Sequence, residues 1–217
     1  MESSPRGRRR DPVRHRAVLD AAVEVLIDRG YDQLTLAEVA RRAGVGRPLI
    51  YQWWGSKPAL VQEALFRPPV TDRPVPSGEG FVADFTALVA DVVALYSRPE
   101  IRAGLTGLIV DMIRRPGLLE ETERRFLAPA RRRYAAVLDE GRREGMVREG
   151  VDAGQILDTL RGTVWFATML DPEIDTGALV ARTTEMLLHG IVPRPGDAPG
   201  PAAPPHTAAT TDRTDRT

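Results

Sequence analysis

The sequence of 217 residues predicts an all-α fold of about nine helices, divided into a small N-terminal domain and a larger C-terminal domain. Three observations support this fold class. Apolar residues recur at helical spacing along most of residues 12–192. Proline and glycine separate these segments, and no segment has a convincing strand pattern. A cluster of proline and glycine at residues 67–79 is typical of a linker, so we place the domain boundary there.

The first helix is predicted to begin at Asp11-Pro12 and to end at Gly30. Proline suits a first helical turn because its missing N–H would be unpaired there in any case. The buried stripe of this helix is formed by Val18, Ala21, Ala22, Val25 and Leu26. Residues 1–11 contain several arginines and are predicted to be a disordered basic arm, which either lies along nucleic acid or is a solvated tail.

Residues 35–57 predict two short helices joined by a tight turn. Thr35 and Glu38 form a capping-box pattern at the start of the first helix, and Gly44 suits a helix end that needs a positive φ. Pro48 suits the first turn of the second helix. Apolar positions that pack the two helices together are Leu36, Val39, Ala40, Ala43, Val45, Ile50 and Trp54. This pattern is typical of a helix-turn-helix, whose second helix enters the major groove of DNA.

Parts of residues 35–57 are also similar to other structures. A structural hairpin of two helices also contains a glycine turn. Gly44-Val45-Gly46 is similar to the start of a dinucleotide-binding loop, but no strand precedes it and Leu49 occupies the place of the third glycine, so we reject that interpretation. Arg41 and Arg42 are equally consistent with DNA contact and with an ordinary solvated helix face.

The remaining helices follow from periodicity and from helix-breaking residues. Ser56 predicts the N-cap of a fourth helix, which runs from Lys57 to Phe66. Beyond the linker, five more helices are predicted: from Phe81 to about residue 98, from Ile101 to about residue 115, from Leu118 to Gly145, from an Asp152–Gln155 cap to Leu170, and from Asp175 to Ile191. Pro129 predicts a kink in the third of these five. Residues 193–217, rich in Pro, Ala and Thr, predict a disordered tail.

Composition excludes several classes of protein. The chain has no cysteine, which excludes disulfides, thiolate metal sites and a cysteine nucleophile. It has no membrane-spanning apolar run and no signal-peptide pattern, so a cytoplasmic protein without membrane contact is expected. His15, His189 and His206 are far apart in sequence, and no catalytic or phosphate-binding motif occurs. We therefore expect no catalytic residue, metal or cofactor, although a helical enzyme or binding protein that uses the hairpin only as scaffold remains an alternative.

Charge is distributed unevenly although the net charge is zero. Residues 1–60 contain 11 basic and 7 acidic side chains, a balance of +4, so the remainder carries −4. A basic end favours attraction to nucleic-acid phosphates, because that attraction depends on the local patch. Lys57 is the only lysine among the 30 basic residues. Its place at a helix N-terminus suits phosphate binding, and chance explains a single lysine equally well.

Residues 12–65 resemble the DNA-binding domain of the TetR family of transcriptional regulators. The matching positions are Thr35, Gly44-Val45, Tyr51, Trp53-Trp54 and Lys57. Leu49 stands where the family more often has a small or hydroxyl residue, and the tryptophan pair replaces the commoner His or Tyr followed by Phe. These differences leave the operator sequence open. The resemblance implies a homodimeric regulator, in the leading hypothesis a repressor that a small-molecule effector releases from a palindromic operator in double-stranded DNA.

Candidate site residues follow from the resemblance and the helix pattern. DNA contacts are expected from Thr35, Arg47, Pro48, Leu49, Tyr51, Gln52, Trp53 and Lys57, with Thr35 and Lys57 on phosphates. A ligand pocket is expected within residues 80–192, lined by Phe85, Tyr96, Met112, Phe126, Trp165 and Phe166, each of which would also suit plain core. A dimer interface on the last two helices is expected from Leu157, Leu160, Val164, Leu179, Thr183, Met186 and Leu187, with a monomer as the alternative.

Overall fold

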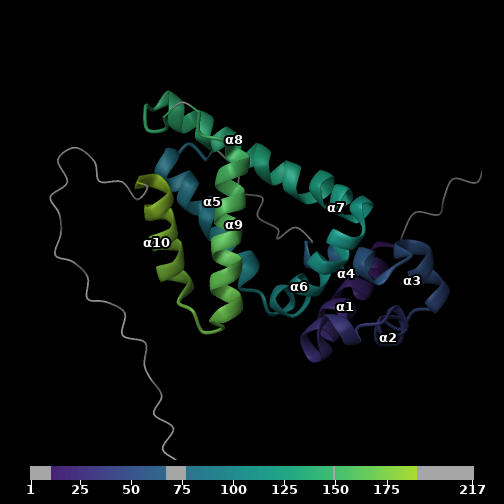
Figure 1. The fold of residues 1–217 in the computed structure, drawn as a ribbon. Coiled ribbons are helices and arrows are strands. Elements are labelled where there is room, and N and C mark those ends of the chain that lie inside the picture. Colours follow the sequence, from purple (N-terminus) through teal and green to yellow (C-terminus); the bar gives the residue numbers. More distant parts are fainter. Residues whose placement is uncertain (1–10, 67–76, 149, 190–217) are drawn as a thin grey trace, which may run out of the picture.

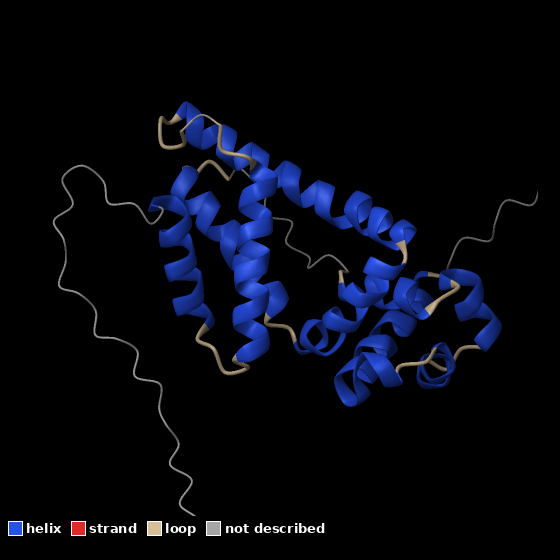
Figure 2. Cartoon of the chain, in the orientation of Figure 1, coloured by secondary structure: helices blue, strands red, loops and turns tan. Residues whose placement is uncertain are grey.

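The computed structural model of the protein describes residues 11–66, 77–148 and 150–189. Most of the predicted arm, most of the predicted linker and the whole predicted tail lie outside these residues. Every regular element in the described ranges is helical, as Figure 2 shows, which confirms the all-α prediction. Ten α-helical segments are present, and two of them join through a π-helical turn into one continuous helix, so the described ranges contain nine helices.

Two groups of helices are distinguished by their position. The first group, which we call the head, consists of α1 (Pro12–Gln33), α2 (Leu36–Arg42), α3 (Arg47–Trp54) and α4 (Lys57–Leu65). The second group, which we call the body, consists of α5 (Phe81–Tyr96), α6 (Pro99–Arg114), α7 (Pro116–Thr122), the π turn η1 (Glu123–Leu127), α8 (Ala128–Arg143), α9 (Ala153–Leu170) and α10 (Thr176–His189). Figure 1 shows the head on the right, with α9 and α10 at the opposite end of the molecule.

Helix starts lie at the capping residues that the sequence indicates. Side-chain oxygens accept hydrogen bonds from the backbone N–H groups of the first turn at Asp11, Thr35, Ser56 and Asp152. The end of α1 differs from the prediction, because Gly30 adopts φ +75° but helical structure resumes and continues to Gln33. This last turn places Tyr31 against the core, where it is 7% exposed.

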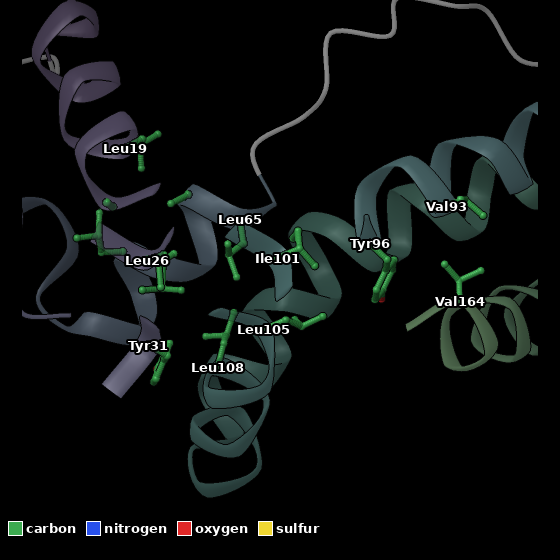
Figure 3. Close-up of a cluster of buried hydrophobic side chains, with 14 of the residues drawn as sticks. Leu19, Leu26, Tyr31, Leu65, Val93, Tyr96, Ile101, Leu105, Leu108 and Val164 are labelled. Carbon is green, nitrogen blue, oxygen red and sulfur yellow. The ribbon is translucent and has the colours of Figure 1, made fainter. Parts of the chain in front are cut away.

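The helix α6 connects the head to the body through an apolar seam. It packs against α1 and α4 more extensively than against α5. Figure 3 shows Leu26 of α1 and Leu65 of α4 near Ile101, Leu105 and Leu108 of α6, and all five side chains are buried. One hydrophobic cluster therefore extends from the head into the body. Because this cluster is closely packed, a displacement of α6 would also displace the helices of the head.

Two glycines on the inner face of α6 allow the close approach of α1. A Cβ atom placed on Gly107 would lie 2.3 Å from Cδ1 and 2.9 Å from Cβ of Tyr31. A Cβ atom on Gly104 would lie 3.1 Å from Leu26 Cδ2 and 3.2 Å from Leu65 Cδ1. The Tyr31 hydroxyl crosses the same seam and donates a hydrogen bond to Asp111. Burial and this hydrogen bond raise the pKa of Tyr31 above its ordinary value, so the hydroxyl keeps its proton.

The long helix predicted over 118–145 extends from Pro116 to Arg143 and contains the π turn. Pro129 lacks a backbone N–H, and its ring would clash with the carbonyl of Arg125 in a regular α-helix. The π turn at Glu123–Leu127 comes directly before this point. The irregularity that Pro129 predicts is therefore a widened turn that keeps the helix continuous.

A buried polar contact links the head to α7. Gln62 of α4 is 2% exposed, and its side-chain amide donates to the hydroxyl of Thr122, which is 1% exposed. The same amide lies 3.4 Å from the carbonyl oxygen of Leu118, to which the Thr122 hydroxyl donates at 2.8 Å. Since Thr122 is the last residue before the π turn, α4 is bonded directly to the start of that turn.

Candidate nucleic-acid interface

The turn between α2 and α3 places α3 at the edge of the head. Gly44 adopts φ +65°, a conformation that favours glycine, and the Val45 N–H donates to the carbonyl of Ala40 at 3.0 Å. The inner face of α3 is anchored by Ile50, which is 0% exposed, and by Trp54, which is 9% exposed. Figure 1 shows α2 and α3 on the side of the molecule away from α9 and α10. The outer face of α3 is therefore open to a partner.

Predicted contact residues on α3 occupy this outer face. Arg47, Pro48, Tyr51 and Gln52 are exposed and follow the i, i+1, i+4, i+5 spacing of one helix side. Arg47 makes no hydrogen bond or ion pair with any residue that the structure describes. Leu49 and Trp53, also predicted, are half-buried at the edges of this strip. The strip thus offers a cation, a phenol, an amide and a small apolar surface.

Thr35 acts as an N-cap, as predicted, with its hydroxyl 3.2 Å from the Glu38 N–H. The second half of the predicted capping box is absent, because the Glu38 carboxylate binds Arg41 through two hydrogen bonds of 2.9 and 2.7 Å. A bond between two charged groups is stronger than one to a neutral N–H. It lowers the pKa of Glu38. Arg42 pairs with Asp28 at 2.6 Å, so both arginines have carboxylate partners, as on a solvated helix face.

Lys57 has structural partners in the head. Its Nζ donates to the carbonyl of Tyr31 at 3.0 Å and lies 3.4 Å from the carbonyl of Asp32. It also lies 4.2 Å from the centre of the Tyr31 ring. These carbonyls are at the C-terminus of α1, where the helix dipole attracts a cation. An ammonium has three N–H donors, so one remains for a phosphate beside α4.

A polar cluster that sequence reasoning missed fixes α3 against α1 and α4. The Trp54 indole donates to Glu63 at 2.8 Å, and His15 Nε2 lies 3.0 Å from the other Glu63 oxygen. The His15 ring stacks on Trp54 with centroids 5.1 Å apart. A buried indole N–H requires an acceptor, which was the signal available for Glu63. No signal pointed to His15, because the contact depends on how α1 crosses α3.

Two cavities in the body are lined by residues of the predicted pocket. One of about 300 Å³ lies among α5, α8, α9, the π turn and the end of α4, and the predicted pocket residues Tyr96 and Phe126 line it. The other, of about 530 Å³, is lined by Phe85 and lies at the ends of α5, α8, α9 and α10. Neither cavity is lined by Met112, which contacts Thr122, or by Trp165. The pocket prediction is wrong for Phe166, which is 64% exposed on the outer face of α9.

The predicted dimer interface also needs correction. Five of its seven residues are at most 2% exposed within one chain, namely Leu157, Leu160, Val164, Leu179 and Thr183. They pack against other body helices and offer almost no area to a partner. Leu187 is half-buried, and Met186 is 40% exposed. The exposed apolar side chains of α9 are instead Phe166 and Leu170, at 64% and 69%.

A helix-turn-helix head with an exposed second helix, joined to a larger helical body with cavities, is the architecture typical of a DNA-binding transcriptional regulator. The model of the bacterial regulatory proteins of the tetR family matches residues 18–64, and that of the tetracyclin repressor-like C-terminal domain matches residues 75–187. The chain therefore belongs to the TetR family of transcriptional regulators. No helix in the described ranges is both long enough and apolar enough to span a membrane.

Individual relatives resemble most of the chain. The HTH-type transcriptional regulator YdeS of Bacillus subtilis is 30% identical over 173 residues, which cover 77% of this chain and 84% of YdeS. The crystal structure of the TetR family regulator SCO0332 is 31% identical, with a TM-score of 0.62 over 84% of this chain and all of that one. The structure of FadR from Bacillus subtilis in complex with stearoyl-CoA shares the fold, with a TM-score of 0.62, 20% identity and coverage of 82% and 100%.

Proposed function

We propose that the protein is a homodimeric repressor that reads a palindromic operator with α3 and leaves it when a small molecule binds the body. Residues 12–66 would form the DNA-binding domain and residues 80–192 the ligand-binding and dimerisation domain, joined by the linker at 67–79. Regulators of this family bind DNA operators and small-molecule effectors and act as dimers, which supports the proposal. The observation that carries it is the exposed strip of Arg47, Pro48, Tyr51 and Gln52 on a helix anchored by Ile50 and Trp54.

In the proposed complex, α3 lies in the major groove and its strip reads base edges. Arg47, at the N-terminus of α3, would reach a guanine or a phosphate, and Pro48 and Leu49 would touch thymine methyl groups. Tyr51, Gln52 and Trp53 would contact bases or backbone. The Thr35 N-cap at the start of α2 and the third N–H of Lys57 would approach phosphates on either side of the groove. Recognition would then rest on α3 and positioning on its neighbours.

The proposed dimer uses the outer faces of α9 and α10. Phe166 and Leu170 on α9 and Met186 on α10 form the large exposed apolar side chains of these two helices. Such exposed apolar surface on a folded chain is typical of an interface. Gly162 lies one turn before Phe166, and a Cβ atom placed on it would meet no atom within 4 Å, so a partner helix has room there. Two helices from each copy, related by a twofold axis, would form a four-helix interface.

The proposed route from effector to DNA passes through α4. Phe66, which follows α4, and residues of the π turn both line the 300 Å³ cavity. Gln62 bonds α4 to Thr122 directly before that turn. An occupant of the cavity that favours another position of the π turn would therefore shift α4 and change the separation of the two α3 helices. The FadR structure with stearoyl-CoA supports a small-molecule effector.

A binding titration tests the proposed function. The purified protein is titrated against labelled DNA from upstream of its own gene, over a series of salt concentrations, with an unrelated duplex of equal length as control. We expect tighter binding to the upstream DNA, with an affinity that falls linearly on a logarithmic salt scale as counterions are released. Equal affinity for both duplexes at every salt concentration would contradict an operator-specific regulator.

A further inference from the structure

The 300 Å³ cavity combines a buried apolar wall with a partly exposed cationic rim. Its wall includes Leu88, Leu157, Tyr134 and Tyr96, which are 1 to 5% exposed. Its charged lining residues are Arg125, Arg133, Arg161 and Asp91. Their side chains are 44, 40, 28 and 35% exposed, so they stand at the mouth of the cavity. Three guanidinium groups and one carboxylate therefore line this mouth, and two carboxylates beside it, Glu121 and Asp158, pair with Arg125 and Arg161.

Existing ion pairs at the mouth are weak enough for a ligand to compete with them. Arg133 pairs with Asp91 at 3.1 Å, Arg161 with Asp158 at 3.3 Å, and Arg125 with Glu121 at 3.7 Å. All six side chains are between 28% and 58% exposed, where solvent screening leaves an ion pair little net stability. An anion that entered the apolar cavity would meet the same cations with less solvent between them, where their attraction is stronger.

Arg161 is held in place for such an anion. Its Nε donates to the hydroxyl of Tyr96 at 3.2 Å, and Tyr96 is 5% exposed in the cavity wall. Its Nη1 faces Asp158, whereas its Nη2 has no hydrogen-bond partner among the described residues. Because Tyr96 fixes the guanidinium plane, little side-chain freedom is lost when an anion binds. Arg125, 5.3 Å from the Phe126 ring, lies at the π-turn side of the same mouth.

We propose that this cavity binds an amphiphile with one anionic head group, held by Arg161 and Arg125, and an apolar chain along the buried wall. The volume of about 300 Å³ is at the small end of ligand pockets. At roughly 30 Å³ per heavy atom, the share of one water in the liquid, it holds a chain of about ten atoms. The effect of this ligand on DNA rests on the proposed function, whereas its binding does not.

Calorimetric titration with three probes of one chain length tests the ligand class. Decanoate and decyl phosphate carry anionic heads of different kinds, and 1-decanol is the neutral counterpart. We expect both anions to bind at least tenfold more tightly than the alcohol, because charged groups form the stronger hydrogen bonds. Binding of one anion alone would identify the kind of head group. Equal affinity for alcohol and anions, or no binding of any probe, would overturn the proposal.

Matched variants test the residues. Arg161→Gln and Arg125→Gln are expected to weaken decanoate binding about tenfold each. The control is Arg124→Gln, because Arg124 also pairs with Glu121 but does not line the cavity. Val92→Trp fills the cavity and is expected to abolish binding of every probe. Melting curves identify any variant that fails to fold. If Arg161→Gln and Arg125→Gln bind decanoate like Arg124→Gln, the head-group assignment is wrong.

Binding of DNA by the same proteins separates the two proposals. The three arginine variants leave the head unchanged, so each is expected to bind upstream DNA like the unaltered protein in the absence of a probe. Loss of decanoate affinity with normal DNA binding supports the ligand class. Absence of specific DNA binding in the unaltered protein would defeat the proposed function and leave the calorimetric result intact.

Discussion

In the head, different residues serve recognition and stability, whereas in the body the same residues serve both. In the head, Ile50 and Trp54 hold α3, whereas Arg47 and Tyr51 face outward and contribute little to packing. In the body, Tyr96 is a buried core residue and also part of the cavity wall. The head can therefore change its target with little change in stability. A substitution that alters the cavity of the body also alters its core. The stability of each such variant must therefore be measured together with its ligand binding.

The largest effect is expected at the outer face of α9, where Phe166 is exposed and is not part of the buried core. Phe166→Asp is expected to weaken dimer association by roughly 3 kcal/mol or more, because it places an unpaired charge in the proposed apolar interface. Sedimentation at micromolar concentration should then give one subunit. The control is Ile113→Asp, since Ile113 on α6 is 74% exposed but lies away from α9 and α10. A Phe166→Asp protein that remains dimeric would exclude this face.

The next effect tests whether the head and the body share one core. Gly107→Ala is expected to lower the free energy of unfolding by about 1–3 kcal/mol, because the new methyl group overlaps the Tyr31 ring and its Cβ. Urea unfolding measures this change. Gly117→Ala on α7 is the control, since its methyl group meets no atom within 4 Å, and stability should be unchanged or rise by up to about 1 kcal/mol. Equal stability of the two variants would show that α1 and α6 move apart at little cost in free energy, which would contradict a tightly packed shared core.

A smaller effect, confined to DNA binding, is expected at Arg47. Arg47→Ala should weaken binding to upstream DNA about tenfold and reduce sequence preference, because this exposed side chain is proposed to contact the groove. Its free energy of unfolding should change by less than about 0.5 kcal/mol. Arg41→Ala serves as control, since Arg41 already pairs with Glu38, and its effect on binding should be smaller. A loss of stability in Arg47→Ala would show that recognition and packing are not separate in the head.

The smallest effect is expected at Lys57, where the head departs from this separation. Lys57→Met removes the hydrogen bond to the Tyr31 carbonyl and should lower the free energy of unfolding by about 1 kcal/mol in the absence of DNA. If the third N–H also contacts a phosphate, the logarithmic salt slope of DNA binding should fall by about 1. A lower stability with an unchanged slope would assign Lys57 a structural role alone.

The sequence predicted the head well because the geometry of the head depends on local sequence signals. A cap at Thr35, a positive φ at Gly44 and proline at position 48 each determine a few residues of backbone, and together they fix which side of α3 faces outward. The carbonyl partners of Lys57 and the stacking of His15 on Trp54 could not be predicted in this way. Both contacts depend on the position of α1 relative to the other helices of the head, and no local sequence pattern determines that position.

The body was predicted at the level of helices but not of faces. Leu160 and Phe166 belong to the same apolar helix, yet one is 0% and the other 64% exposed. Apolar side chains suit a core, a cavity wall and a dimer interface equally well, so composition does not distinguish these roles. The π turn escaped prediction for a related reason, because Pro129 indicates a disturbance but not how the chain accommodates it.

The hydrogen bond between Gln62 and Thr122 affects how α4 is able to move. Apolar side chains tolerate gradual sliding, since a small displacement exchanges one contact for another. A buried amide and hydroxyl have no such intermediate, because separating them leaves polar groups unsatisfied in an apolar seam, at a cost of about 1–3 kcal/mol. The head is therefore expected to occupy discrete positions relative to α7. A weak ligand that supplies less than this energy would bind the body without altering the spacing at the DNA.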